Sequence, residues 1–328
     1  MPAIPVIDMS ALRDGDGTSR RDLARQFGHT FERFGFATIV GHGVETAIAA
    51  RAYDLANRFF DLPLDEKMRS ALPDRVKNRG YVPAGVESVA LTRGDDRPPD
   101  LVEALVFYAL HMEPADLLPG TSAATGNLIP ANPPELAAAL RDYFVAVRDL
   151  SGDLMRLSAL ALDLPEDFFA PYIDKRKGVL RLAYYPEQTD APEPGQLRYG
   201  AHSDYGGFTI LRQDSAPGGL QVELDGEWID VLPHPGAFTI NIGDLIARWT
   251  NDRWRSTLHR VVNPPRDGDI ATRRLSLVFF SGPNDDALIE CLPTCKSDAN
   301  PAKYGPVVAR QYVLSKLDRS MPAELETR

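Results

Sequence analysis

Apolar residues recur at helical spacing in three stretches of the chain. The longest stretch begins at Pro134 and ends near Leu162. Its apolar stripe consists of Leu136, Leu140, Phe144, Val147, Leu150, Leu154, Leu157 and Ala161. Shorter stripes cover residues from about 18 to 34 and from about 45 to 60. Residues three or four apart share one face of an α-helix, so each stripe predicts a helix with one buried face. We expect the helix over 134–163 to lie against a sheet as the spine of the fold.

A period of two, typical of strands, marks shorter runs. These runs cover residues 4–8, 35–40, 178–185, 208–211, 220–224, 227–231, 237–242 and 274–280. Successive side chains on a strand point to opposite faces of its sheet. In the run 178–185, Leu180 and Leu182 would therefore face the helices, while Arg181 and Tyr185 would face a cavity. Between the two halves, residues 90–133 are irregular apart from an apolar run at 101–108, and long loops of this kind often form lids or walls of binding sites.

The composition is that of a globular protein. The chain has 328 residues, is 44% hydrophobic and carries a formal charge of −10 from 36 basic and 46 acidic residues. It is long enough for a large core in one domain with additions. The acidic balance, without a basic block, argues against nucleic-acid binding. No apolar stretch has the length of a membrane span, and the start lacks the features of a signal peptide, so we expect a cytoplasmic protein. Cys291 and Cys295 form neither a disulfide framework nor a complete zinc site.

Candidate metal ligands lie in the second half of the chain. His202 and Asp204 are two apart, and on a strand this spacing directs both side chains to one face. His259 lies in a β-branched run that predicts a strand able to return beside the first. Two imidazoles and one carboxylate form the facial triad that leaves positions open on a non-haem Fe(II). A structural zinc site is the poorer fit because no fourth ligand is present.

Arg274 and Ser276 follow, two apart on a predicted strand. A guanidinium beside a hydroxyl can bind a carboxylate, since arginine contacts both oxygens and serine donates a third hydrogen bond. An ion pair at a strand edge remains the alternative for Arg274 alone.

These residues, in this order, resemble the isopenicillin N synthase-like branch of the Fe(II)/2-oxoglutarate-dependent oxygenases. The resemblance also includes Tyr185-Pro186 before the triad, and Gly219–Val222 and Asn241–Asp244 between its ligands. It implies an α+β fold with a mainly β core, a double-stranded β-helix or jelly-roll, and flanking helices. The implied division is an N-terminal non-haem dioxygenase region over 4–130, the spine helix over 134–163, the jelly-roll core over 176–285, and a C-terminal strand and helix over 286–328.

The resemblance also implies roles for individual residues. His202, Asp204 and His259 would hold Fe(II), and Arg274, Ser276 and Tyr185 would bind the distal carboxylate of 2-oxoglutarate. With O₂, such an enzyme oxidises a small organic substrate and releases succinate and CO₂. Hydroxylation is the commonest outcome, and desaturation and cyclisation are others. Relatives commonly have Asn at the position of Ala183, so this chain has one polar contact fewer near the cosubstrate.

Five residues are candidates for contacts with the substrate: Arg79, Tyr81, Phe107, Arg181 and Phe280. The arginines would suit an acid, and the aromatic side chains an apolar or aromatic body. Residues 78–83 resemble a segment that lines the substrate pocket in the family, and they are equally consistent with a solvated loop holding one packed Tyr. His42 is expected to be structural. Asp244 is expected to fix a turn or to cap the short helix through Trp249.

Two other functions remain open at this stage. A non-haem iron oxidase such as isopenicillin N synthase shares the Arg-x-Ser pair but uses no 2-oxoglutarate, and its clamp would bind the substrate's own carboxylate. A non-catalytic jelly-roll protein that binds a ligand is the third possibility. The substrate is not specified, and secondary metabolism and catabolism are both open. Relatives are commonly monomers, and we expect the same here.

Overall fold

The computed structural model describes residues 3–71, 79–95, 97–110, 127–175, 177–265 and 271–320. For residues 318–320 it describes the backbone only. The helices are α1 (Ser10–Asp14), α2 (Gly17–Arg33), α3 (Thr46–Phe60), α4 (Leu64–Met68), the 3₁₀ helix η1 (Val89–Arg93), α5 (Leu136–Ala161), α6 (Ala170–Ile173), α7 (Asp244–Trp249), the 3₁₀ helix η4 (Pro293–Cys295) and α8 (Ala309–Ser320). The strands are β1 (Val6–Asp8), β2 (Phe36–Val40), β3 (Gly80–Val82), β4 (Glu103–Tyr108), β5 (Val179–Tyr185), β6 (Tyr199–His202), β7 (Phe208–Arg212), β8 (Leu220–Leu224), β9 (Glu227–Asp230), β10 (Phe238–Ile242), β11 (His259–Val261), β12 (Arg274–Phe280), β13 (Leu288–Ile289) and β14 (Val307–Val308).

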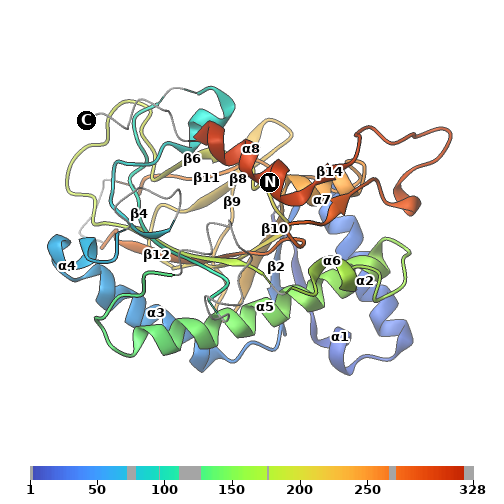
Figure 1. Ribbon diagram of the computed structural model, residues 1–328, viewed down its shortest axis with the longest axis horizontal. Helices are drawn as coiled ribbons and strands as arrows, with labels where there is room; N and C mark the ends of the chain where they lie inside the picture. Colours follow the sequence, from blue (N-terminus) through green and yellow to red (C-terminus); the bar gives the residue numbers. More distant parts are fainter. Residues whose placement is uncertain are drawn as a thin grey trace.

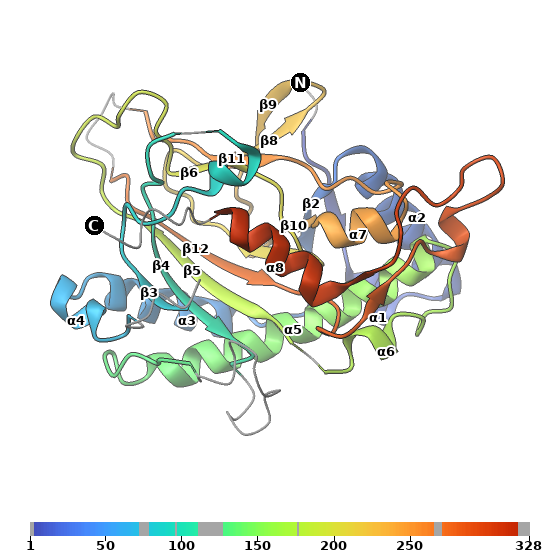
Figure 2. The same cartoon turned by 45° about the horizontal axis from the view of Figure 1, so that its top comes forward.

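Two largely antiparallel sheets form the body of the described part of the chain. The larger has the strand order β1-β2-β10-β7-β12-β5-β4-β3, and the smaller has the order β6-β11-β8-β9. The pairing of β1 with β2 is parallel. Helices α2, α3 and α5 run along one side of the larger sheet, and the smaller sheet lies on its other side (Figures 1 and 2). This is the jelly-roll with flanking helices that the resemblance implied.

The face of the larger sheet that meets the helices is apolar. Leu182, Leu277 and Phe279 are fully buried, and the ring of Phe279 lies 5.1 Å from that of Phe144 on α5. The residues between them along β5 and β12, such as Arg181 and Ser276, point to the opposite side. The period of two therefore places a hydrophobic core on one face of the sheet and a cavity on the other.

The three predicted helical stripes are α2, α3 and α5, within two residues of their expected ends. The C-terminal helix begins at Ala309, directly after Val307 and Val308, which pair with β13. Within the irregular stretch 90–133, the run 101–108 contains β4, while residues 111–126 lie outside the described part of the chain.

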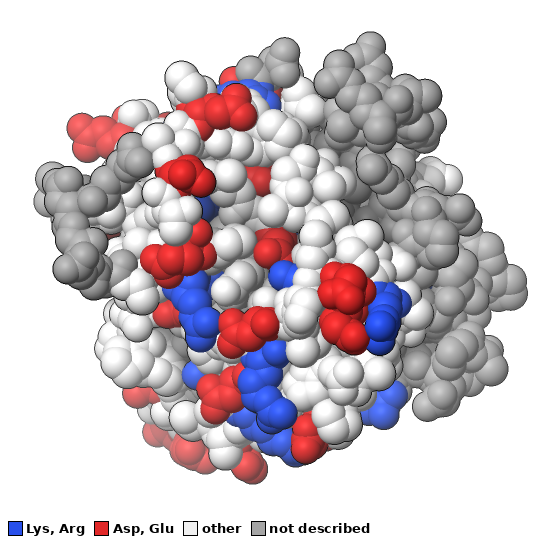
Figure 3. All heavy atoms as spheres, turned by 90° about the vertical axis from the view of Figure 1, so that its left-hand side faces the viewer, with Lys and Arg blue, Asp and Glu red and all other residues white. Residues whose placement is uncertain are grey.

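His42 is structural, as expected. Its ring is buried, Nδ1 accepts a hydrogen bond from the backbone N–H of Val44, and Nε2 lies 2.8 Å from the carbonyl oxygen of Gly236. No helix among the described residues is long and apolar enough to cross a membrane. On the face shown in Figure 3, acidic and basic side chains lie next to one another, so neither sign of charge is segregated there.

Candidate active site

Three side chains converge at one end of the space between the two sheets. His202 ends β6 and His259 begins β11, and the two are register partners across these strands. Nε2 of His202 lies 3.7 Å from Oδ1 of Asp204, and Nε2 of His259 lies 3.8 Å from the same oxygen. All three potential ligand atoms lie within 4.8 Å of one another. Among the described residues, this is the one group of three or more His, Cys, Asp or Glu side chains with such an arrangement.

Asp204 does not lie on a strand, so the expectation that strand periodicity directs it to the same face as His202 is wrong. It follows the end of β6 by two residues, and its position depends on contacts with more distant segments. Thr209 Oγ1 and Asn241 Nδ2 each donate a hydrogen bond of 2.6 Å to Oδ2 of Asp204. The backbone N–H of Asp244 donates to the carbonyl oxygen of Asp204 at 2.8 Å. Because Oδ2 is held in this way, Oδ1 is left facing the two imidazoles.

The imidazoles are oriented by backbone carbonyl groups. Nδ1 of His202 lies 2.9 Å from the oxygen of Gly200, and Nδ1 of His259 lies 3.1 Å from that of Thr257. A carbonyl oxygen only accepts, so each Nδ1 carries the proton and each Nε2 presents a lone pair. Burial, together with the neighbouring His259, lowers the pKa of His202 to about 3.

The carboxylate of the triad is ionised. Burial opposes its ionisation, but the two imidazoles and the hydrogen bonds from Thr209 and Asn241 hold the pKa of Asp204 below its ordinary value. Two neutral imidazoles and one carboxylate on one side of a site, with the cavity on the other, are the donor set that non-haem Fe(II) takes. The residues present therefore fit a ferrous ion.

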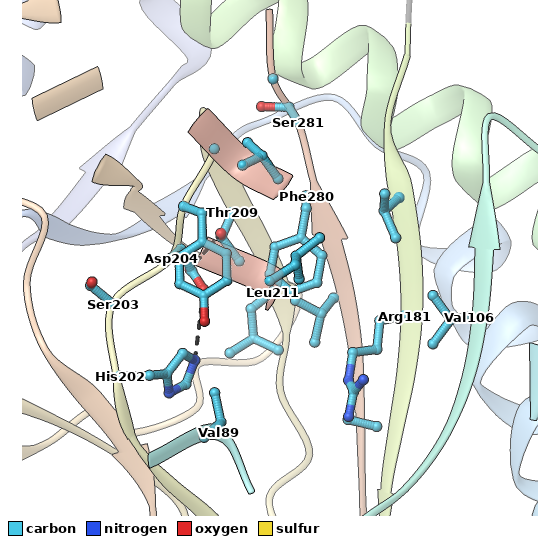
Figure 4. Close-up of a pocket in the computed structure, with 18 of the residues that line it drawn as sticks. Val89, Val106, Arg181, His202, Ser203, Asp204, Thr209, Leu211, Phe280 and Ser281 are labelled. Atoms are coloured by element: carbon cyan, nitrogen blue, oxygen red, sulfur yellow. Dashed lines mark hydrogen bonds and ion pairs between the residues drawn. The ribbon is translucent and has the colours of Figure 1, made fainter. Parts of the chain in front are cut away.

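The cavity beside the triad has a volume of about 370 Å³. One wall of the cavity is formed by the larger sheet, and the register of its strands places the side chains of this wall in rows. Arg274 lies opposite Tyr185, and four residues further along β12, Val278 lies opposite Arg181, which in turn pairs with Val106. At a rise of about 3.3 Å per residue, Arg274 and Val278 are separated by about 13 Å along the strand. Figure 4 shows Arg181 and Val106 on the wall opposite His202 and Asp204.

Arg274 lies at the inner end of this wall and is 3% exposed. Nη1 donates to the carbonyl oxygen of Ala216 at 2.9 Å, and Nη2 donates to Oε1 of Gln213 at 3.0 Å. No carboxylate in the described part of the chain forms an ion pair with it. Among the described residues the guanidinium contacts a carbonyl and an amide oxygen instead of a carboxylate, so the alternative of an ion pair is wrong. Ser276 and Tyr185 line the cavity beside it.

The candidate substrate residues divide into two groups. Arg79, Arg181 and Phe280 line the cavity, whereas Tyr81 and Phe107 do not, so the prediction for these last two is wrong. Phe107 lies between two cavity-facing residues of β4 and therefore points to the helices, where it is fully buried. The Tyr81 hydroxyl donates to Glu103 at 2.6 Å on that same side of the sheet.

The sequence analysis did not predict several of the residues that line the cavity or support the triad. Glu87 forms a bidentate ion pair with Arg181, and Tyr199 lies between Arg181 and His202. Thr209 lies in a run identified as a strand, and Asn241 in a motif of the resemblance, so both could have been named from their positions. Glu87 precedes Arg181 by 94 positions, and no local pattern connects the two.

Helix α8 covers the mouth of the cavity. Val313, Leu314 and Leu317 of this helix line the cavity. Figure 2 shows the helix lying between the strands of the smaller sheet and those of the larger sheet. Asp244 holds this helix, because its carboxylate accepts a hydrogen bond from Lys316 Nζ at 2.8 Å. Ser256 Oγ, outside the helix, donates to the same carboxylate at 2.7 Å. The expectation that Asp244 caps α7 is therefore corrected: Gly243 takes the cap position.

Known proteins resemble the chain along almost its whole length. Residues 176–283 match the family described as the 2OG-Fe(II) oxygenase superfamily, and residues 4–131 match the family described as non-haem dioxygenase in morphine synthesis N-terminal. The chain is 35% identical to the 2-oxoglutarate-Fe(II) type oxidoreductase hxnY of Emericella nidulans, over 95% of this chain and 88% of that protein. It is 34% identical to a homoarginine-6-hydroxylase of Oryza sativa subsp. japonica, over 96% of both.

Solved structures show the same fold. A full-length Neurospora crassa protein in complex with alpha-KG and thymine superposes with a TM-score of 0.84 at 29% identity, covering 96% of both chains. The complex of JOX2 with 2OG, Fe and JA has a TM-score of 0.76 at 30% identity, covering 98% of this chain and 90% of that one. The expected cofactors, Fe(II), 2-oxoglutarate and O₂, are thereby confirmed, and the alternatives of a 2-oxoglutarate-independent oxidase and of a non-catalytic protein are set aside. The chain belongs to the Fe(II)/2-oxoglutarate-dependent oxygenase family.

Proposed function

We propose that this oxygenase hydroxylates a small organic molecule bound between the wall formed by β5 and β12 and the wall that carries the triad. His202, Asp204 and His259 hold Fe(II), and Arg274, Ser276 and Tyr185 bind the distal carboxylate of 2-oxoglutarate. The convergence of three ligand atoms at one end of an otherwise largely apolar cavity is the observation that carries this proposal.

Bound Fe(II) supplies the activation of O₂ that is coupled to decarboxylation of 2-oxoglutarate to succinate and CO₂. The protein's own groups prepare this site. Thr209 and Asn241 fix the carboxylate of Asp204, and backbone carbonyls fix the tautomers of both imidazoles. Such partners of metal ligands are typically worth about 10-fold to 100-fold in metal affinity.

The binding of the cosubstrate rests on preorganised donors. Gln213 and the carbonyl of Ala216 hold the guanidinium of Arg274, and Arg keeps further N–H groups to donate to a carboxylate. Burial raises the pKa of Tyr185 to about 12, so its hydroxyl stays protonated at neutral pH and can donate a hydrogen bond. Ala183 faces the cavity as the register partner of Ser276, so the missing Asn leaves room there.

A small molecule is the substrate class that suits the cavity and the relatives. A volume of about 370 Å³ accommodates a ligand of metabolite size. The Neurospora crassa and JOX2 complexes contain thymine and JA respectively, and the rice relative is a homoarginine hydroxylase. We propose that the enzyme acts as a monomer, because one chain supplies both the triad and the clamp, and that it works in the cytoplasm, where its two free cysteines would stay reduced.

Separate titrations of metal and cosubstrate test these roles. Arg274→Ala should weaken 2-oxoglutarate binding about 100-fold in calorimetry, because charge-assisted hydrogen bonds are lost, and leave Fe(II) affinity unchanged. His259→Ala should abolish Fe(II) binding and succinate formation. Arg260→Ala is the matched control, since this neighbouring arginine bonds to Gln221 and does not line the cavity. Equal loss of metal and cosubstrate affinity in Arg274→Ala would contradict the proposed clamp.

A further inference from the structure

A buried ion pair forms part of the cavity wall. Arg181 Nη1 donates to Glu87 Oε1 at 3.0 Å, and Arg181 Nη2 donates to Glu87 Oε2. The two side chains are 8% and 9% exposed, and both line the cavity. Arg181 comes from β5, whereas Glu87 comes from the segment between β3 and η1.

The position of the pair places it with the substrate and not with the cosubstrate. Arg181 lies in the row of Val278, about 13 Å along the sheet from Arg274. The guanidinium of Arg181 lies 5.4 Å from the ring centre of Tyr199, and that ring lies 4.9 Å from the imidazole of His202. The pair therefore lies beside the triad, separated from it by one aromatic ring.

Glu87 is held in place through its backbone. Its carbonyl oxygen accepts from the N–H of Asp100 at 2.8 Å. The carboxylate of Asp100 in turn accepts from the N–H groups of Val89 and Gly200, both at 2.9 Å. Gly200 precedes His202 on β6, so these contacts connect the segment that carries Glu87 to the strand that carries a metal ligand. The ion pair is a built feature of the site.

The pair presents hydrogen-bonding groups without net charge. A guanidinium has five N–H donors and a carboxylate has about four acceptor positions, and the bidentate contact uses two of each. A substrate carboxylate at this wall would meet Glu87, and an ammonium group would meet Arg181. Either would have to break a buried ion pair and leave one charge without a partner, which is unfavourable. Val106, Leu211 and Val278 add apolar surface beside the pair.

We infer that Arg181 and Glu87 together determine specificity, and that the substrate presents to them a neutral edge with a donor and an acceptor side by side, as in a cyclic amide or imide. The N–H of such a group donates to Glu87, and its carbonyl oxygen accepts from Arg181. This inference rests on the proposed function, and it replaces the expectation that Arg181 binds an acid.

Binding selectivity tests the inference. Uracil serves as the neutral imide, benzoate as the anion and benzylammonium as the cation, each titrated by calorimetry into the full chain loaded with Mn(II) and 2-oxoglutarate. The wild type should bind uracil about tenfold more tightly than either charged probe. Glu87→Gln removes the acid, so the preference should move to benzoate. Arg181→Gln leaves the acid unpaired, so the preference should move to benzylammonium.

The matched control is Glu103→Gln. Glu103 also forms a buried ion pair, with Lys67 Nζ at 2.7 Å, but its contacts lie on the helix side of the sheet, and neither residue lines the cavity. This variant should keep the wild-type order of the three probes.

Binding of 2-oxoglutarate to the same samples separates the inference from the proposed function. Affinity for 2-oxoglutarate should be retained in Glu87→Gln and Arg181→Gln, and its retention shows that the site is folded. Three results would overturn the inference. The wild type could prefer benzoate, or it could bind 2-oxoglutarate but no uracil. The third result is an unchanged order of the probes in both variants. Failure of the wild type to bind 2-oxoglutarate would instead count against the proposed function.

Discussion

His202 and His259 lie directly opposite each other on β6 and β11, and each directs Nε2 toward the same oxygen of Asp204. The register of two short strands therefore sets the spacing of two of the three proposed metal ligands. Because β11 also pairs with β8, that register is supported from both sides. The third proposed ligand, Asp204, lies outside the sheet and is oriented by hydrogen bonds, so the residues that donate them can be tested directly.

Thr209→Val should weaken Fe(II) binding. The hydroxyl of Thr209 donates to Oδ2 of Asp204, and without it the carboxylate can rotate away from the imidazoles. We expect a loss of about tenfold in Fe(II) affinity, measured by anaerobic calorimetry. Thr30→Val is the control, because this buried hydroxyl donates to the carbonyl of Gln26 within α2. Equal Fe(II) affinities for the two variants would show that Thr209 does not orient the ligand.

Asp100 should make stability depend on pH. Burial raises the pKa of Asp100 to about 7, from an unfolded value near 3.8. Between these values the folded state keeps a proton that the unfolded state has released, so stability falls as pH rises through this window and levels off above it. Thermal unfolding from pH 5 to pH 8 should therefore show the wild type losing stability relative to Asp100→Asn. A constant difference between the two proteins would contradict the raised pKa.

Lys316→Met should loosen the helix over the cavity mouth. Lys316 pairs with Asp244, and the side chains are 31% and 13% exposed, so the contact contributes about 0.5–1 kcal/mol. Amide hydrogen exchange in α8 should rise about twofold to fivefold. The control is Lys303→Met, which removes an exposed pair with Asp252 outside the cavity. Equal exchange in α8 for both variants would exclude Asp244 as the anchor of this helix.

Neighbouring residues of β12 should respond differently to truncation. Leu277→Ala removes a fully buried side chain from the core beneath α5, so we expect a loss of about 2–5 kcal/mol in the free energy of unfolding. Val278→Ala enlarges the cavity on the opposite face and should cost much less. Denaturant titration of both variants measures the difference. Similar losses in the two would mean that Val278 belongs to the core.

Periodicity along the chain determined the helices, the main strands and the side to which Arg181, Tyr185 and Ser276 point. These features depend on local spacing, which the sequence displays directly. The order of His202, Asp204, His259 and Arg274 also identified the metal and the cosubstrate, through resemblance to a family.

Tertiary structure alone decided which distant groups meet. The carboxylate of Asp204 is oriented by Thr209 and Asn241, and Glu87 reaches Arg181 from a loop 94 positions away. The face of the sheet to which Tyr81 and Phe107 point could be assigned only from the pairing of β3 with β4 and of β4 with β5. Register and loop path arise from packing between segments far apart in the chain, and such contacts leave no periodic trace in the sequence.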